Sequence, residues 1–167
     1  MGRALVNLRK DSRWRNRVRQ PYSAPRLGYP LIGGSYQLVG SSLMVRFANQ
    51  LLKCLVKKEG YIFGKPVRHM GLCVSGQTVE DLLQRVQRTP RVHTGVVLMI
   101  GTNNAIRRES VKQACRLHRK LVSVLHSKGA ELMFICTIPP IPKHDHSKKV
   151  KSWIRQYNKQ LKQYKKV

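Results

Sequence analysis

Short apolar runs alternate with longer segments of helical periodicity through the middle of this chain. These runs predict strands at 36–40, 67–74, 96–100 and 132–138, of which 96–100 is continuously apolar, as in a strand buried on both faces. The segments between and after them place apolar residues three and four positions apart, which predicts helices over 43–58, from 78 onward, over 110–128 and over 150–164. Alternating strands and helices are typical of a parallel sheet with helices on both faces. The sequence therefore predicts an α/β fold, a three-layer α/β/α sandwich around a mostly parallel sheet.

Local signals support several of these elements. Thr78 is followed three positions later by Asp81, which is close to a capping box at the start of a helix. Gly129 is placed to end the helix over 110–128. The apolar spacing predicts the buried faces of two helices: Leu43, Phe47, Leu51, Leu52 and Leu55 in the first, and Val79, Leu82, Leu83 and Val86 in the second.

Basic residues outnumber acidic ones so strongly that they constrain the partner. The chain has 33 Lys and Arg against 7 Asp and Glu, a formal net charge of +26. Such a charge favours a polyanion, with nucleic acid first and an anionic membrane surface second. Both ends are more basic than the middle, so we expect a flexible basic arm over 1–30 ahead of one domain over 31–167.

The sequence contains no segment of the kind that directs a protein into or across a membrane. No run reaches the ~18 apolar residues of a transmembrane helix, and the first apolar run is too short for a signal peptide. We therefore expect a cytoplasmic protein that does not bind membranes. The 4 cysteines all lie in apolar segments and are expected to be buried, reduced thiols.

Polar residues follow the predicted strands where the carboxyl ends of parallel strands would meet. Ser42 enters a helix after the first strand, Gly76 follows the second, and Asn103 follows the third. A serine hydroxyl with a glycine N–H and an asparagine amide as oxyanion donors forms an acyl-transfer site. The strings VGSSLM, VSGQTVEDLL and VVLMIGTNNA resemble the nucleophile, glycine and GxND blocks of the SGNH (GDSL) hydrolase family. This resemblance covers residues 36–164 and implies an SGNH hydrolase-like, flavodoxin-like fold.

The resemblance fails at the residues that catalysis needs. Ser41 and Asn104 stand where that family has aspartates, and the D-x-x-H block that supplies its general base is not found. In the family this block follows a further strand, so the last strand is expected to be missing. The HDH string at 144–146 has the wrong spacing for a catalytic pair and offers too few ligands for a metal site.

We therefore predict a pseudo-hydrolase with no catalytic residue, no metal and no cofactor. A serine without a general base stays a weak nucleophile. The vestigial hydrolase positions are Ser42, Gly76 and Asn103.

A second resemblance is more specific. The strings YPLIG, LKCLVKK, GLCVSGQT, IGTNNAIRR and YNKQLKQY are similar to the C-terminal (OSK) domain of the insect Oskar family. This resemblance implies an RNA-binding, catalytically inert member of the hydrolase-like fold that organises germ plasm for germ-cell formation. It implies binding to the 3′ untranslated regions of germ-plasm messenger RNAs, such as those of the nanos type, in ribonucleoprotein granules at the oocyte posterior. Germ-granule proteins are further expected partners.

The charge pattern suggests where RNA would bind. Phosphate contacts from Lys and Arg supply most of the affinity of a protein with this charge, and they carry no sequence information. Basic residues three and four apart on the last predicted helix form one stripe, whereas those that end a helix also suit its dipole. The candidate RNA-binding residues are Lys53, Lys57, Lys58, Arg107, Arg108, Lys148, Lys151, Arg155, Lys159 and Lys162.

Two alternatives to the RNA-binding function stay open. The first is an esterase or acyl hydrolase that uses Ser42 with an oxyanion hole at Gly76 and Asn103. The second is a protein–protein scaffold whose basic surface recruits acidic partners. Retention of Ser42 fits all three functions, because a serine at a helix start also serves as a cap.

Overall fold

The structure is a computed structural model, and it describes residues 31–32, 36–51, 57–62 and 65–164. Its strands are β1 (Leu31–Ile32), β2 (Tyr36–Gly40), β3 (Lys57–Ile62), β4 (Lys65–Met70), β5 (Cys73–Val74), β6 (Gly95–Met99) and β7 (Leu132–Ile135). Its helices are α2 (Ser42–Leu51), α3 (Val79–Arg88), α4 (Thr102–Ile106), α5 (Val111–Ser127), the 3₁₀ turn η2 (Pro142–His144) and α6 (Lys148–Leu161).

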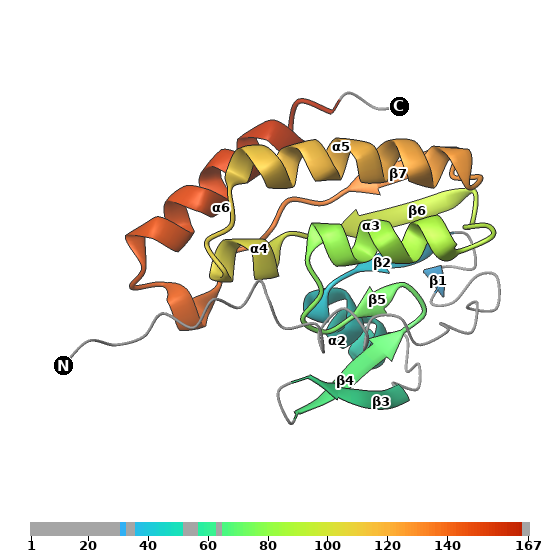
Figure 1. The fold of residues 1–167 in the computed structure, drawn as a ribbon, viewed down its shortest axis with the longest axis horizontal. Helices are drawn as coiled ribbons and strands as arrows, with labels where there is room; N and C mark the ends of the chain where they lie inside the picture. The colour runs from blue at the N-terminus through green and yellow to red at the C-terminus, as the bar shows by residue number, and fades with distance from the viewer. Residues whose placement is uncertain (1–30, 33–35, 52–56, 63–64, 165–167) are drawn as a thin grey trace.

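One mixed sheet runs through the molecule (Figure 1). Its strand order is β3-β4-β5-β2-β6-β7, and the four strands from β5 to β7 are parallel. β4 pairs with β5, β3 with β4, and β1 with β2, all antiparallel. The predicted α/β sandwich with a mostly parallel sheet is confirmed.

The sheet separates two apolar clusters. On one face, Leu38 and Cys73 pack with Met44, Val45 and Ala48 of α2. On the other face, β2, β6 and β7 pack against α3, α5 and α6, and Figure 1 shows α3 and α5 alongside β6 and β7 with α6 beside α5. Alternate residues along β2 and β6 therefore face different clusters, as the period of a strand requires.

The predicted helix signals are confirmed where α3 and α5 begin and end. The Thr78 side chain accepts a hydrogen bond from the Asp81 N–H while Asp81 accepts one from the Thr78 N–H, which is a capping box. Ser110 caps the start of α5, and the chain leaves its end at Gly129 with a φ of 106°. All four residues expected on the buried face of α3 are buried.

Two element boundaries were predicted wrongly. The helix expected over 43–58 ends at Leu51, and residues 57 and 58 belong to strand β3. The single strand expected over 67–74 is two strands, β4 and β5, which pair antiparallel. Gly71, at a φ of 56°, supplies the left-handed residue that reverses the chain between them. The predicted strand VRHMGLCV contains this glycine, but an isolated glycine in a strand pattern does not show that the chain reverses there.

Two burial predictions also need correction. Phe47 was expected on the buried face of its helix, but it is 38% exposed, and Met44, Val45 and Ala48 face the sheet instead. The strand predicted over 132–138 was expected to be buried. In β7, Leu132 and Phe134 are 43% and 49% exposed, because α2 covers the strands around β2 on that face and β7 ends the strand order.

Candidate functional site

The four parallel strands bring their carboxyl-end loops to one edge of the sheet. Ser42 begins α2 directly after β2 and is half-buried, while Ser41 before it is fully buried. The Ser41 N–H donates to the carbonyl oxygen of Met99 at 3.3 Å, which joins the loop after β2 to the end of β6. Among the residues whose side chains the structure describes, no histidine or carboxylate is hydrogen-bonded to the Ser42 hydroxyl.

Asn103 lies at this edge as predicted, and one of the two N–H donors of its amide is used within the protein. Its Nδ2 donates to the Gln77 carbonyl oxygen at 2.8 Å. Gln77 in turn donates through Nε2 to the carbonyl oxygens of Gly40 and Leu72. These hydrogen bonds connect the carboxyl ends of β2, β5 and β6 to one another. In an oxyanion hole, an N–H of the Asn103 amide would have to donate to a substrate oxygen, and the bond to Gln77 leaves one N–H for that.

Gly76 also lies at this edge, next to the guanidinium group of Arg107. It has a φ of 82°, and its carbonyl oxygen accepts from Arg107 Nη2 at 3.2 Å. Asn104, where a hydrolase would have an aspartate, accepts from the Val79 N–H and donates to Glu109 Oε2 at 2.6 Å. The structure brings Ser42, Gly76 and Asn103 together, and it places the neighbouring polar groups in internal hydrogen bonds.

The His-Asp-His string at 144–146 holds a different position. Asp145 forms an ion pair with Lys151 of α6, with 2.8 Å between Oδ1 and Nζ. Within the described ranges, no group of three or more His, Cys, Asp or Glu side chains is placed to hold a metal ion. The string therefore lies at the protein surface before α6, where Asp145 forms an ion pair.

Five candidate RNA-binding residues share the solvent face of α6, which we name the α6 ridge: Lys148, Lys151, Arg155, Lys159 and Lys162. All five are exposed, and the opposite face of the helix packs into the core through Val150, Trp153, Ile154, Tyr157 and Leu161. The Lys151–Asp145 ion pair is half-exposed or more on both sides, so it contributes at most about 1 kcal/mol and does not prevent Lys151 from contacting a phosphate.

Two further candidates lie near the ridge, two lie on a distant strand, and one is outside the described residues. Arg107 and Arg108 follow α4, which packs against α6, and the Trp153 Nε1–H donates to the Glu109 carbonyl oxygen just after them. Residues 57 and 58 lie on β3, at the edge of the sheet away from β6 and β7. Lys53 lies outside the described residues.

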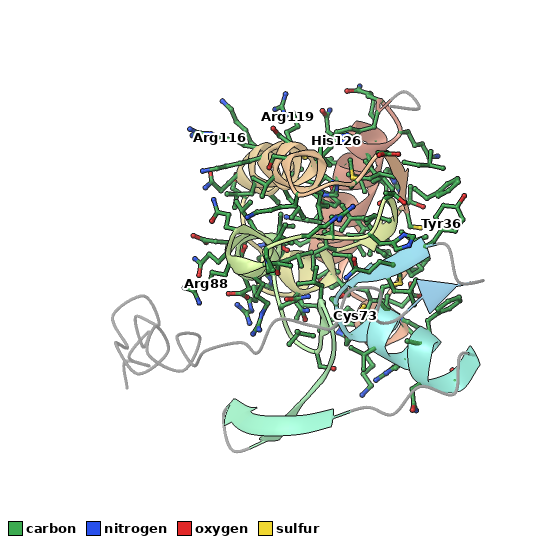
Figure 2. The ribbon with its side chains drawn as sticks, turned by 90° about the vertical axis from the view of Figure 1, so that its right-hand side faces the viewer. Tyr36, Cys73, Arg88, Arg116, Arg119 and His126 are labelled. Carbon is green, nitrogen blue, oxygen red and sulfur yellow. The ribbon has the colours of Figure 1, made fainter. Side chains whose placement is uncertain are left out.

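The outer face of α5 carries basic residues that the sequence analysis did not select: Lys112, Arg116, Arg119 and Lys120. All four are exposed, and Figure 2 shows Arg116 and Arg119 pointing outward from the helix. α5 packs beside α6. The sequence did indicate that these residues are exposed, because they lie opposite the apolar face of α5. Only the structure shows that this basic face adjoins the ridge.

A buried aromatic cluster lies beneath the two helices. His118 of α5 is 1% exposed, and its Nδ1 is 2.7 Å from the Tyr157 hydroxyl of α6. The rings of Trp153 and Tyr157 stack at 4.8 Å, and the Tyr164 ring lies 5.6 Å from that of His118. Burial lowers the pKa of His118 to about 4, so its ring is neutral at physiological pH. The sequence analysis missed His118, because hydrophobic periodicity identifies the buried face of a helix only through its apolar residues.

No helix in the described ranges has both the length and the apolar character to cross a bilayer.

Burial raises the pKa of the Cys73 and Cys115 thiols, so they stay protonated at neutral pH. Both are free and buried, as predicted, and Cys136 is free and partly buried.

Comparison with known proteins identifies the fold and the family. The sequence model of the family described as the OSK domain matches residues 27–167. The chain is similar to the maternal effect protein oskar of Drosophila virilis, at 29% identity over 144 residues. That match covers 85% of this chain and 22% of the relative, so the chain spans about a fifth of the relative's length.

Two solved structures share the fold. The crystal structure of the OSK domain of Drosophila Oskar superposes with a TM-score of 0.67 at 23% identity, covering 76% of this chain and 59% of that one. The crystal structure of the C-terminal domain of the same protein gives the same TM-score and covers 58% of that chain.

Proposed function

This chain belongs to the OSK domain family, and from that premise we propose that it is a non-catalytic RNA-binding domain of an Oskar-like germ-plasm protein. Its partners would be the 3′ untranslated regions of germ-plasm messenger RNAs, together with germ-granule proteins. It would act in cytoplasmic ribonucleoprotein granules at the oocyte posterior, for germ-cell formation. The sequence analysis gave the same proposal from charge and resemblance, and the structure adds a surface on which to test it.

One observation carries the proposal: α5 and α6 lie side by side, and neither contains an acidic residue. The exposed basic residues of the α6 ridge and of the outer face of α5 therefore form one surface with few counter-charges. Unneutralised cations of this kind attract phosphates over distances of about a Debye length and release counterions when they bind. An RNA strand would lie along this surface, held mainly by phosphate contacts.

The strand-end edge supports the non-catalytic part of the proposal. One N–H of the Asn103 amide is bound to the Gln77 carbonyl oxygen, and no general base is hydrogen-bonded to Ser42 among the residues whose side chains the structure describes. Without activation, a serine hydroxyl is a weak nucleophile at neutral pH. The three vestigial positions would then serve as a helix start, a turn and an internal hydrogen-bond donor.

The RNA-binding proposal is tested by neutralising three residues of the ridge. The variant Arg155→Gln, Lys159→Gln, Lys162→Gln is expected to bind a single-stranded RNA about 30-fold more weakly than wild type at 100 mM salt. Its plot of log affinity against log salt should flatten by about 2, at ~0.7 for each lost phosphate contact. Fluorescence anisotropy with a labelled 3′ untranslated segment measures both.

The matched control removes the same charge from other elements: Arg46→Gln, Arg88→Gln, Arg91→Gln. These three residues are exposed on α2, at the end of α3 and in the loop after it. The control should stay within about threefold of wild type, because only long-range attraction is lost. Equal weakening in both variants would mean that net charge, and no particular surface, accounts for binding.

The non-catalytic proposal is tested through Ser42→Ala. Hydrolysis of a p-nitrophenyl ester is expected to run at the same background rate in wild type and variant, because the hydroxyl has no base to activate it. A rate in wild type that is clearly above background and that Ser42→Ala abolishes would show that the hydrolase alternative is right.

A further inference from the structure

A pocket of about 200 Å³ opens between α5 and the end of α6. It is lined by Cys115, His118 and Arg119 from α5 and by Gln160, Gln163 and Tyr164 from the end of α6. The volume lies below the roughly 300 Å³ at which drug-sized sites begin. The pocket therefore suits one small planar group.

The lining combines an apolar wall with groups that form hydrogen bonds. Tyr164 is partly buried and presents an aromatic ring, while Arg119, Gln160 and Gln163 are exposed at the rim. A primary amide offers both donors and an acceptor, and a guanidinium offers donors only. His118 is 1% exposed, and its buried Nε2 has no hydrogen-bond partner in the described part of the chain, so one residue of the lining carries an unsatisfied polar atom.

The pocket lies within the proposed RNA surface. Arg116 and Lys120 flank it on α5, and Lys159 and Lys162 flank it on α6, all exposed. A ligand that carries phosphates would therefore be drawn to its mouth. Protein sites for single-stranded nucleic acid combine such a basic track with aromatic side chains on which bases stack.

We propose that this pocket receives one unpaired nucleobase of the RNA strand held on the α5–α6 surface. The inference rests on the proposed RNA-binding function and adds to it a contact with the base itself. The base would stack on the Tyr164 ring, and its edge would meet the amides of Gln160 and Gln163. Phosphate contacts cannot distinguish one base from another, so this pocket would be a source of base preference.

The test compares RNA with and without bases. Anisotropy is measured for oligouridine, oligoadenosine and oligocytidine of one length, and for an abasic oligomer of the same length and charge. The affinity of wild type for the abasic oligomer is expected to be about tenfold lower than its affinity for the oligomer of the base that it prefers. The variant Gln160→Ala, Gln163→Ala should bind the three oligomers that carry bases about equally, and all three more tightly than the abasic oligomer, because Tyr164 still stacks on a base. Its salt slope should be that of wild type, because no charge is removed.

A matched control is Gln113→Ala, Gln156→Ala, which alters two exposed glutamines of the same helices outside the pocket. It should keep the base preference of wild type. If wild type binds the abasic oligomer as tightly as the others, or if the pocket variant keeps the preference, the pocket does not take a base. A failure of the proposed RNA-binding function would look different. Wild type would then show no binding with a steep salt dependence to any of the four oligomers.

Discussion

Replacing Gly40 with alanine is expected to lower the free energy of unfolding by about 3 kcal/mol or more, the upper range for overpacking a core. A Cβ at this position would lie 2.2 Å from the backbone carbonyl oxygen of Met99 and 2.8 Å from Met44 Cγ. Gly40 pairs with Met99 of β6 and with Cys73 of β5, so it lies at the centre of the parallel strands. The clash is with backbone, so no side-chain rotation relieves it. Urea denaturation followed by circular dichroism measures the loss.

Gly76→Ala is the matched control for this prediction. Its Cβ would meet nothing within 4 Å, but the residue has a φ of 82°, where alanine is strained. The expected cost is therefore only the ~1–2 kcal/mol of a left-handed residue. A Gly40→Ala variant no less stable than Gly76→Ala would mean that β2 and β6 can separate without loss, contrary to the packing seen here.

Acid is expected to destabilise the domain through His118. The folded pKa is about 4, against about 6.5 in an unfolded chain. Between these values the unfolded chain binds a proton that the folded chain excludes, so stability falls as the pH falls. The contribution is fully present above pH ~7 and about 3 kcal/mol is lost by pH ~4, at 1.36 kcal/mol per pKa unit.

The measurement is the free energy of unfolding at several pH values for wild type and for His118→Phe, Tyr157→Phe. This double variant removes both partners of the buried hydrogen bond, which leaves neither group unsatisfied. Other titrating groups are common to both proteins, so the difference between the two curves isolates His118. Parallel curves would show that His118 takes up a proton in the folded state near its ordinary pKa.

Much of the fold could be predicted because its strands and helices have clear periods. The ends of α5 lie within a residue of the helix predicted over 110–128 from its apolar spacing and from Gly129. The region between Leu51 and Cys73 could not be predicted. The reversal at Gly71 depends on one backbone angle, and the β3–β4 hairpin adds antiparallel strands to a pattern that suggested one parallel crossover.

The residues of the candidate site could be predicted from the sequence, but the hydrogen bonds between them could not. Ser42, Gly76 and Asn103 do meet at one edge, because parallel strands end there together. The sequence offered the Asn103 amide as an oxyanion donor only in the hydrolase alternative, and the structure shows it donating to the Gln77 carbonyl oxygen. The spacing of residues in the sequence does not reveal such a pairing. The α5–α6 surface likewise needed the packing of two helices, since each stripe alone has the composition of any solvated helix face.

The hydrogen bonds at the strand-end edge also determine how the domain opens. Gln77 links its own loop to Gly40 after β2, and Asn103 links the loop after β6 to Gln77. Local opening of any one loop would strip hydrogen bonds from the other two, and buried groups left unpaired are costly. These loops therefore form one cooperative unit, whose amides exchange with solvent together and more slowly than surface loops usually do.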